Sequence, residues 1–195
     1  MNSEKDLKGF EWTQRKELKY YSELCRAMEY LAQDERTVFL GQAVAVKGTA
    51  MTTTLKNVPE SKKIELPVAE EMQLGLSTGM ALNGYVPVSI YPRWNFLLLA
   101  TNQLVNHLDK MKHMTSGGFQ PKVIIRTSIG SERPLNPQCQ HLGDFTDAFR
   151  LMLTNTEIIR LDEPEQIFPA YQRALERTDG KCTILVEHGD FYNEK

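Results

Sequence analysis

The sequence contains few cysteines, no long apolar run and no excess of either charge. Its three cysteines, Cys25, Cys139 and Cys182, lie far apart and form no CxxC pair. This spacing argues against a zinc site or a disulfide framework, and we expect the protein in a reducing cytoplasm. The longest strongly apolar run, Phe96 to Ala100, is far too short to cross a bilayer, and the first residues, MNSEKDLKGFEW, lack the apolar stretch of a secretory signal. The 23 basic and 25 acidic residues leave a formal net charge of −2, so we expect neither a nucleic-acid partner nor membrane association.

Motifs that would name a reaction directly are scarce as well. The sequence has no Walker loop GxxxxGK and no HExxH helix. His141 follows Gln138-Cys139-Gln140 in a predicted ligand-side loop, although an unpaired loop histidine is more often a surface residue than a catalytic one. Tyr91, Trp94 and Phe96 cluster at a predicted strand-to-helix junction, where core packing is the simpler explanation.

Size and composition suit one globular domain. The chain has 195 residues, 41% of them hydrophobic and 25% charged, which is enough for a core of ordinary size. No linker rich in Pro, Gly or Ser divides it. We therefore predict a single unit with an N-terminal helical segment over residues 1–34 and an α/β domain over residues 35–195.

Helical and strand patterns alternate along the chain. Strands are predicted at residues 37–41, 64–68, 85–91, 122–127, 156–161 and 183–187. Helices are predicted at residues 14–33, 70–82, 94–114, 144–153 and 163–177, and a mobile loop at 46–63. This alternation predicts a three-layer α/β/α fold, in which helices cover both faces of a mainly parallel sheet. Ligands of such sheets gather beyond the carboxyl ends of the strands, so the expected site loops are residues 41–63, 66–71, 91–96 and 127–142.

Glu70 and Glu71 stand where a predicted strand gives way to a predicted helix. The exposed amides and the dipole of a helix N-terminus stabilise a carboxylate there, so either residue could serve a site or merely complete the first turn. Within the same helix, Gly75 and Gly79 each cost about 1 kcal/mol relative to alanine, which indicates close approach of another backbone. That backbone could belong to the sheet of this chain, the simpler reading, or to a second subunit.

A series of motifs runs through LPVAEEMQLGLSTGMALNGYVPVSIYPRWNFLLLATNQLVNHLDKMKHMTSGGFQPKVIIRTSIG and the later QCQHLGDFTDAF. They are a Pro-hydrophobic-small-Glu segment, spaced glycines in a helix, Gly-x-x-Pro before a strand, a phenylalanine at the start of the long helix, a Gly-Gly turn, an ArgxxxGly strand end and a Gln-His pair. In this order and at these intervals, the motifs resemble the pyrimidine-binding domain of thiamine-diphosphate-dependent enzymes. The resemblance covers about residues 35–187. It is nearest to the β subunit of the 2-oxoacid (pyruvate or branched-chain) dehydrogenases and more distant from transketolase.

The resemblance implies roles for particular residues. Glu70 matches the family's catalytic glutamate, which hydrogen-bonds N1′ of the cofactor's aminopyrimidine and favours its imino tautomer. The imino nitrogen then takes the proton from C2 of the thiazolium, and the resulting carbanion attacks the carbonyl of a 2-oxo acid or ketose. Phe96 matches the aromatic residue that packs against the pyrimidine, and Pro92 and Trp94 lie where the family lines the same pocket. His141 matches a histidine that faces the thiazolium and substrate, as a proton donor or anion partner.

Two departures from the family pattern reshape this pocket. Leu142 stands where the dehydrogenase subunits usually have a serine after Gln-His. The run Tyr91-Pro92-Arg93-Trp94 replaces a run that usually contains methionine and phenylalanine. Arg93 adds a cation, which would suit an anionic substrate.

The resemblance also implies a partner. The family holds the cofactor's diphosphate and Mg²⁺ on a separate domain with a Gly-Asp-Gly motif and a downstream asparagine, whereas the near match here, Gly189-Asp190, lies close to the end of the sequence. We therefore expect half of a split enzyme that binds a small-molecule substrate and has no metal ligands of its own. The expected assembly is a heterotetramer with two copies of each chain, or a self-dimer. The alternative is a non-catalytic homologue that acts as an assembly or regulatory module.

Overall fold

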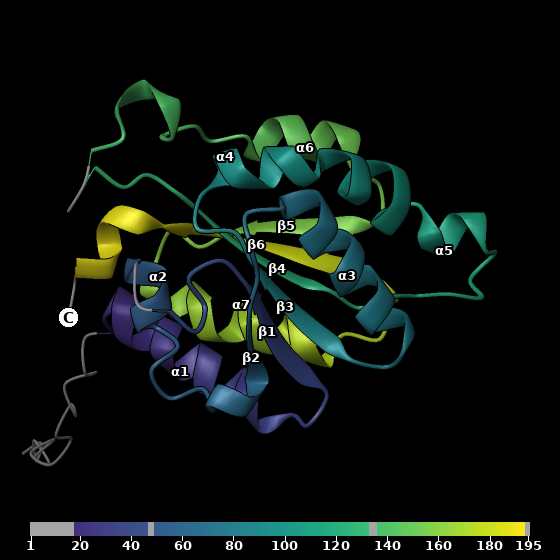
Figure 1. The fold of residues 1–195 in the computed structure, drawn as a ribbon, viewed down its shortest axis with the longest axis horizontal. Helices are drawn as coiled ribbons and strands as arrows, with labels where there is room; N and C mark the ends of the chain where they lie inside the picture. The colour runs from purple at the N-terminus through teal and green to yellow at the C-terminus, as the bar shows by residue number, and fades with distance from the viewer. Residues whose placement is uncertain (1–17, 47–48, 133–135, 194–195) are drawn as a thin grey trace, which may run out of the picture.

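The computed structural model describes residues 18–46, 49–132 and 136–193. These residues build a six-stranded sheet in which all pairs of neighbouring strands are parallel (Figure 1). The strands lie in the order β2-β1-β3-β4-β6-β5. They are β1 (Thr37–Gly41), β2 (Lys63–Glu65), β3 (Val86–Ile90), β4 (Ile124–Ile129), β5 (Thr156–Arg160) and β6 (Cys182–His188). The predicted parallel sheet is confirmed.

Central strands of the sheet contribute side chains to two separate apolar layers. On β4, Ile124 packs into one layer and Ile125 into the other. On β6, Leu185 shares a layer with Ile124, and Ile184 shares a layer with Ile125. Successive side chains of a strand point to opposite faces, so a strand covered on both faces must be apolar at almost every position. The run KVIIRT carries this pattern in the sequence.

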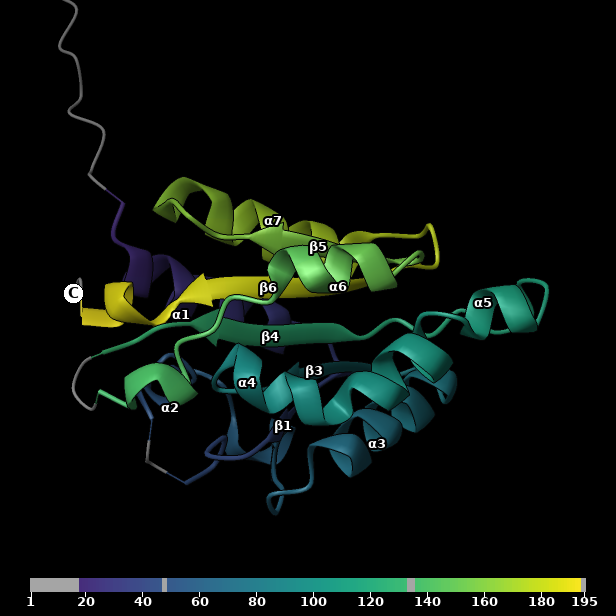
Figure 2. The ribbon, with the colours of Figure 1, turned by 90° about the horizontal axis from the view of Figure 1, so that it is seen from above.

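Helices cover both faces of the sheet, which gives three layers (Figure 1, Figure 2). On one face, α1 (Tyr20–Gln33) packs against α7 (Pro164–Glu176). On the other face lie α3 (Glu70–Leu82), α4 (Trp94–Leu97) and α6 (Thr146–Met152). The predicted three-layer α/β/α fold is therefore confirmed. Within the described ranges, no helix combines the length and the apolar character needed to cross a membrane.

The segment predicted as one long helix over residues 94–114 is instead broken into four pieces. After α4 come a 3₁₀ turn, η2 (Leu98–Ala100), a π-helix, η3 (Gln103–Leu108), and a last α-helical turn, α5 (Met111–Met114). The buried carboxylate of Asp109 accepts backbone N–H groups of Thr154 and Asn155, the latter at 2.8 Å. Asp109, which directly follows the π-helix, is thereby fixed to the segment before β5.

The stretch over residues 46–63, predicted as a mobile loop, also contains regular structure. A short helix, α2 (Ala50–Thr53), is capped by the Thr49 hydroxyl, and a 3₁₀ turn, η1 (Glu60–Lys62), leads into β2. Met51, Leu55 and Val58 are at most 3% exposed and join the core beside α1. Their apolar spacing was present in the sequence but hidden among threonines and lysines. For the predicted helix over residues 14–33, residues 14–17 lie outside the described ranges, and α1 begins at Tyr20.

A buried ion pair joins β4 to β6 below the carboxyl edge of the sheet. The side chains of Arg126 and Glu187 have no solvent exposure, and Arg126 Nε and Nη2 donate to the carboxylate at 2.5 and 2.9 Å. The hydroxyls of Tyr171 from α7 and Tyr192 from η5 (Gly189–Asn193) donate to the same carboxylate. Burial raises the pKa of both phenols, and the Glu187 charge raises it further, so both hydroxyls stay protonated donors.

We expect Arg126→Met to lower the free energy of unfolding by about 3–5 kcal/mol, because it leaves the Glu187 charge buried without its cation. Urea denaturation at pH 7 measures this loss. Arg150→Met is the matched control, since Arg150 pairs with an Asp147 side chain that is 92% exposed, and it should cost less than about 1 kcal/mol. Equal losses in the two variants would contradict the assignment.

Candidate functional site

A cavity of about 390 Å³ opens at the carboxyl edge of the sheet. Four neighbouring strands, β1, β3, β4 and β6, end around it, and α2 closes one side. Its lining residues are Gln42, Ala43, Thr49, Ala50, Met51, Pro92, Arg93, Phe96, Ser128, Gly130, Ser131, Gly189 and Tyr192. The predicted site loops 41–63, 91–96 and 127–142 all contribute, whereas the predicted loop 66–71 supplies none of these lining residues.

Glu70 begins α3 and lies next to this cavity. Its side chain is buried, with 4% of the residue exposed. Gln42, which lines the cavity, donates from Nε2 to Glu70 Oε1 at 3.2 Å. Glu70 Oε2 makes no hydrogen bond to any residue in the described ranges. One carboxylate oxygen is therefore fixed by the protein, and the other is left to accept a further donor.

Close packing between α3 and the sheet sets the position of Glu70. The amide of Gln73, one turn further along α3, donates to Ser89 Oγ at 3.1 Å and to the Ile90 carbonyl at 2.9 Å. A side chain at Gly41 would collide with this arrangement, since a Cβ there would lie 2.4 Å from the Ile90 oxygen. The absence of a side chain at Gly41, at the end of β1, thus lets the N-terminus of α3 sit over the strand ends.

Ser77 belongs to this packing and not to a nucleophile site. Gly75-Leu76-Ser77-Thr78-Gly79 has the GxSxG spacing of a serine elbow, which requires a sharp strand-to-helix turn. Here the motif lies inside α3, and the Ser77 hydroxyl is fully buried and donates to the Gln73 carbonyl at 2.8 Å. The serine has no access to a substrate.

Pro92, Phe96 and His141 come together as the resemblance implied. Pro92 and Phe96 both line the cavity. The imidazole of His141 packs against the Phe96 ring, with the ring centroids 5.1 Å apart. His141 Nδ1 is buried and has no hydrogen-bond partner in the described part of the chain.

Trp94, placed in the same pocket by the resemblance, lies elsewhere. Its side chain has no solvent exposure, and its ring packs against Phe149 of α6 at 4.9 Å between centroids. Two residues along an α-helix turn by about 200°, so Trp94 and Phe96 face opposite directions. The tryptophan is part of the core under α6 and does not line the cavity.

No motif singled out several residues of this cavity. Gln42 and Met51 lie in the predicted site loop 41–63, and Ser128, in β4, lies in the predicted site loop 127–142. Gly189 and Tyr192 follow β6, whose carboxyl end reaches the same edge as those of the other strands. The parallel arrangement was itself predicted, so the loop after the last strand could have been included. Across the described ranges, no three His, Cys, Asp or Glu side chains are grouped to hold a metal ion.

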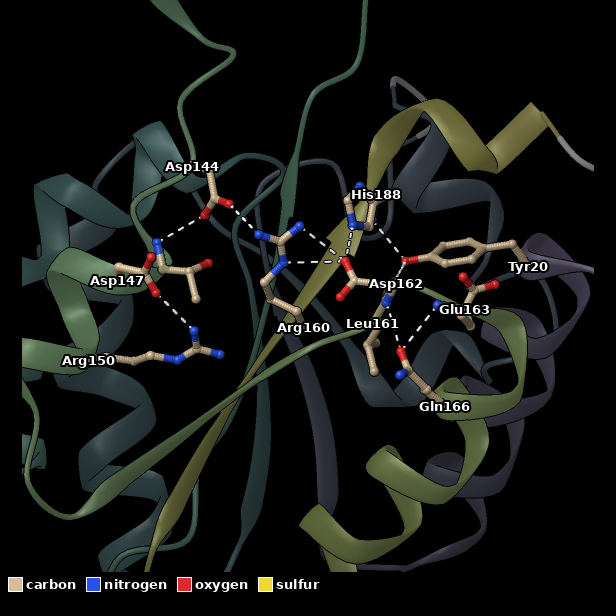
Figure 3. A network of polar contacts seen from close by, with 11 residues as sticks. Tyr20, Asp144, Asp147, Arg150, Arg160, Leu161, Asp162, Glu163, Gln166 and His188 are labelled. Carbon is tan, nitrogen blue, oxygen red and sulfur yellow. Dashed lines mark hydrogen bonds and ion pairs between the residues drawn. The ribbon is translucent and has the colours of Figure 1, made fainter.

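The edge beside the cavity, where β5 and β6 end, is a network of paired polar groups (Figure 3). His188 Nε2 and Asp162 Oδ1 are 2.7 Å apart, and this hydrogen bond holds the pKa of the Asp162 carboxyl below its ordinary value. The Tyr20 hydroxyl accepts the His188 backbone N–H and donates to the Leu161 carbonyl, both at 2.8 Å. Arg160 donates to Asp162 and to Asp144, which lies just before α6. These polar contacts link α1, the segment before α6 and the strand ends.

Comparison with known proteins identifies the family. The model of the transketolase pyrimidine-binding domain matches residues 21–194. This chain belongs to the transketolase pyrimidine-binding domain family. The resemblance noted in the sequence is therefore confirmed.

Curated relatives of this pyrimidine-binding domain are β subunits of 2-oxoacid dehydrogenases. The pyruvate dehydrogenase E1 component subunit beta of Gracilaria tenuistipitata var. liui is 26% identical over 184 residues, which cover 92% of this chain and 55% of the relative. The 3-methyl-2-oxobutanoate dehydrogenase subunit beta of Mycobacterium tuberculosis is 26% identical over 152 residues, 74% of this chain and 42% of the relative. The domain thus spans about half the length of these relatives.

A solved structure shares the fold of the domain. It is described as "Split gene transketolase, inactive beta4 tetramer", with a TM-score of 0.66 and 14% identity. The match covers 89% of this chain and 52% of that chain.

The loop that carries Gln42 is held by the carboxylate of Glu65, at the end of β2. This carboxylate accepts the backbone N–H groups of Ala43, Val44, Ala45 and Val46 at 2.6 to 3.2 Å. Partial burial alone would raise the pKa of Glu65, but the four hydrogen bonds outweigh it and hold the pKa below its ordinary value of 4.5.

We expect Glu65→Gln to destabilise the domain in a pH-dependent way. Because the Glu65 pKa is lower in the folded state, the unfolded chain binds more protons there, and the advantage of wild type over the variant is fully present above pH 4.5. This advantage should shrink as the pH falls through the lowered pKa. Urea denaturation of both proteins from pH 3 to 7 measures the difference. Glu60→Gln, at a side chain that is 78% exposed, should show little of it.

Proposed function

We propose that this chain is the pyrimidine-binding subunit of a two-chain thiamine-diphosphate-dependent enzyme that acts on a 2-oxo acid or ketose. The reaction would be decarboxylation or transfer of a two-carbon unit. A separate subunit carrying Gly-Asp-Gly would hold the diphosphate and Mg²⁺. The observation that carries the proposal is the buried Glu70 carboxylate at the start of α3, beside a cavity with an aromatic wall.

The residues present suit the aminopyrimidine end of this cofactor. Such a ring needs a carboxyl group for its N1′ atom and an apolar wall for its face. Glu70 has one oxygen without a partner among the described residues, and Phe96 and Pro92 offer the apolar wall. Arg93 is the one charged side chain among the described lining residues.

Each residue then has a defined task. Thiamine diphosphate, when bound, supplies an electron sink for cleavage of the bond next to a carbonyl. Glu70 holds a proton at N1′ of the pyrimidine, and Gln42 fixes the orientation of its carboxyl group. Phe96 and Pro92 position the ring and exclude water from it. His141, stacked on Phe96, is placed to give or take a proton at the substrate.

Self-association through α3 is part of the proposal. Met72, Leu76 and Leu82 on the outer face of this helix are 49%, 42% and 40% exposed. Leu99, in η2, is 60% exposed. Gly79 faces open space, since no atom of the described chain lies within 4 Å of the position that a Cβ at this residue would occupy. An apolar helix face with room for another backbone is typical of an interface. The printed description of the structural neighbour as a beta4 tetramer supports an assembly that includes copies of one chain.

Replacing the central carboxylate tests the function. With the partner subunit and cofactor present, Glu70→Gln should reduce turnover of a 2-oxo acid or ketose by about 10²–10⁴-fold, the range for a positioned acid–base group. Steady-state kinetics measures turnover, and calorimetry measures cofactor binding by the same complex. Thermal unfolding should change little, because the substitution keeps the size of the side chain.

Glu71→Gln is the matched control for this experiment. Glu71 is the next residue of α3, but its side chain is exposed and accepts a hydrogen bond from Asn102 at 2.8 Å. It should retain full activity. Full activity in Glu70→Gln would instead favour the assembly-module alternative, and equal losses at both positions would show that the register is misassigned.

Leu76→Arg should weaken self-association by at least about tenfold, because it places a charge in the middle of the apolar face of α3. Sedimentation velocity over a concentration series measures the dissociation constant. Leu151→Arg on α6 is the control, since this leucine is 89% exposed and lies outside that face. A wild-type chain that stays monomeric both alone and with its partner would rule out the proposed interface.

A further inference from the structure

Arg93 is the one charged residue among those that line the cavity. It follows β3 directly, between Pro92, which lines the cavity, and Trp94, which is buried in the core. Partial burial lowers the pKa of its guanidinium, and the charge of Asp190 raises it. A guanidinium nevertheless stays charged at any pH at which a protein folds. The cavity therefore holds a fixed, partly desolvated positive charge.

Among the described residues, this charge has no carboxylate partner. Of the eight arginines in the described ranges, the other seven each form an ion pair: Arg26, Arg36, Arg126, Arg150, Arg160, Arg173 and Arg177. Figure 3 shows the pairing on the neighbouring part of the same edge, where Arg160 donates to both Asp144 and Asp162. Asp190, the acid whose charge acts on Arg93, accepts the backbone N–H of Glu132 at 3.0 Å and forms no ion pair with Arg93. A partly buried guanidinium without a carboxylate partner is available to pair with an anion that enters the cavity.

Only one edge of the Arg93 guanidinium is used by the protein. Nη1 donates to the carbonyls of Gly130, Ser131 and His141 at 2.9, 3.2 and 3.0 Å. Nε and Nη2 make no hydrogen bond to the described residues. These are the two atoms that form a bidentate fork for carboxylate or phosphate. Elsewhere in this chain the same two atoms bind a carboxylate in Arg36, Arg126 and Arg177.

We infer that Arg93 binds the anionic group of the substrate through Nε and Nη2 and selects charged substrates over neutral ones. The inference rests on the proposed function and narrows its substrate class to compounds that carry a carboxylate or a phosphate. Nη1 holds the loop after β4 and the backbone of His141 in place, which leaves the fork preorganised. Arg93 is thus a specificity-determining residue that also positions two walls of the cavity.

Paired charged and neutral ligands test this inference. The complex with its partner is titrated with pyruvate and its uncharged analogue hydroxyacetone, and with fructose 6-phosphate and fructose. Binding is followed by the ¹⁵Nε–¹Hε signal of Arg93 in wild type and by calorimetry in all variants. In Arg93→Gln, affinity for the charged member of a pair should fall roughly 10- to 100-fold further than affinity for the neutral member, the value of a charge-assisted contact.

Two further variants separate recognition from structure. Arg93→Lys keeps the charge but has no fork, so it should recover part of the lost affinity. Arg150→Gln, whose native partner is Asp147 outside the cavity, should bind every ligand as wild type does. If Arg93→Gln lowers the affinity for pyruvate but not for fructose 6-phosphate, the anionic group that Arg93 binds is a carboxylate. If it lowers the affinity for fructose 6-phosphate alone, that group is a phosphate.

The outcomes that overturn the inference are distinct from those that overturn the proposed function. Equal losses for charged and neutral ligands in Arg93→Gln would show that the arginine only holds the loops, and unchanged binding would show that it does not contact the anion. Either result leaves turnover by wild type and its dependence on Glu70 intact. Absence of turnover in wild type, with anion binding still dependent on Arg93, would refute the proposed function and retain the anion site.

Discussion

The parallel direction of all six strands is the constraint on which the rest of this structure depends. Because β1, β3, β4 and β6 run the same way, the segments that follow them meet at one edge and enclose the cavity. Gly41 and Gln73 then let α3 approach that edge closely enough for Glu70 to lie beside Gln42. The Arg126–Glu187 pair ties two of these strands together immediately below the site. The site is thus a product of strand direction and close packing more than of any single loop.

Charge is distributed unevenly along this edge. Where β5 and β6 end, arginine, histidine and aspartate side chains neutralise one another. Around the cavity, several polar atoms have no hydrogen-bond partner among the described residues: Oε2 of Glu70, Nδ1 of His141, and Nε and Nη2 of Arg93. Polar atoms of this kind, gathered at one cavity, are available to a ligand. The outer face of α3 exposes apolar side chains, so the proposed interface would lie on the same helix as Glu70.

Much of the fold could be predicted because strands buried on both faces and amphipathic helices leave separate patterns in the sequence. KVIIRT identified β4, and the helix predicted over residues 70–82 matches α3. Patterns failed where a distant contact decided the backbone. The single helix expected over residues 94–114 became a series of α, 3₁₀ and π turns around the Asp109 anchor, and the loop expected at 46–63 contains α2 because Met51 reaches the core.

The sequence by itself determined the family and the parallel architecture. It also indicated a short set of candidate site residues that belong to the family's motifs, including Glu70, Phe96 and His141. Motif matching compares positions along a chain, so it could not distinguish Trp94, which faces the core, from Phe96, two residues away, which faces the cavity. Nor could it reveal that Gln42 contacts Glu70, or that Arg93 alone among the described arginines has no carboxylate partner. Only the tertiary structure decided these points, because burial and charge pairing depend on residues that are distant in sequence and adjacent in space.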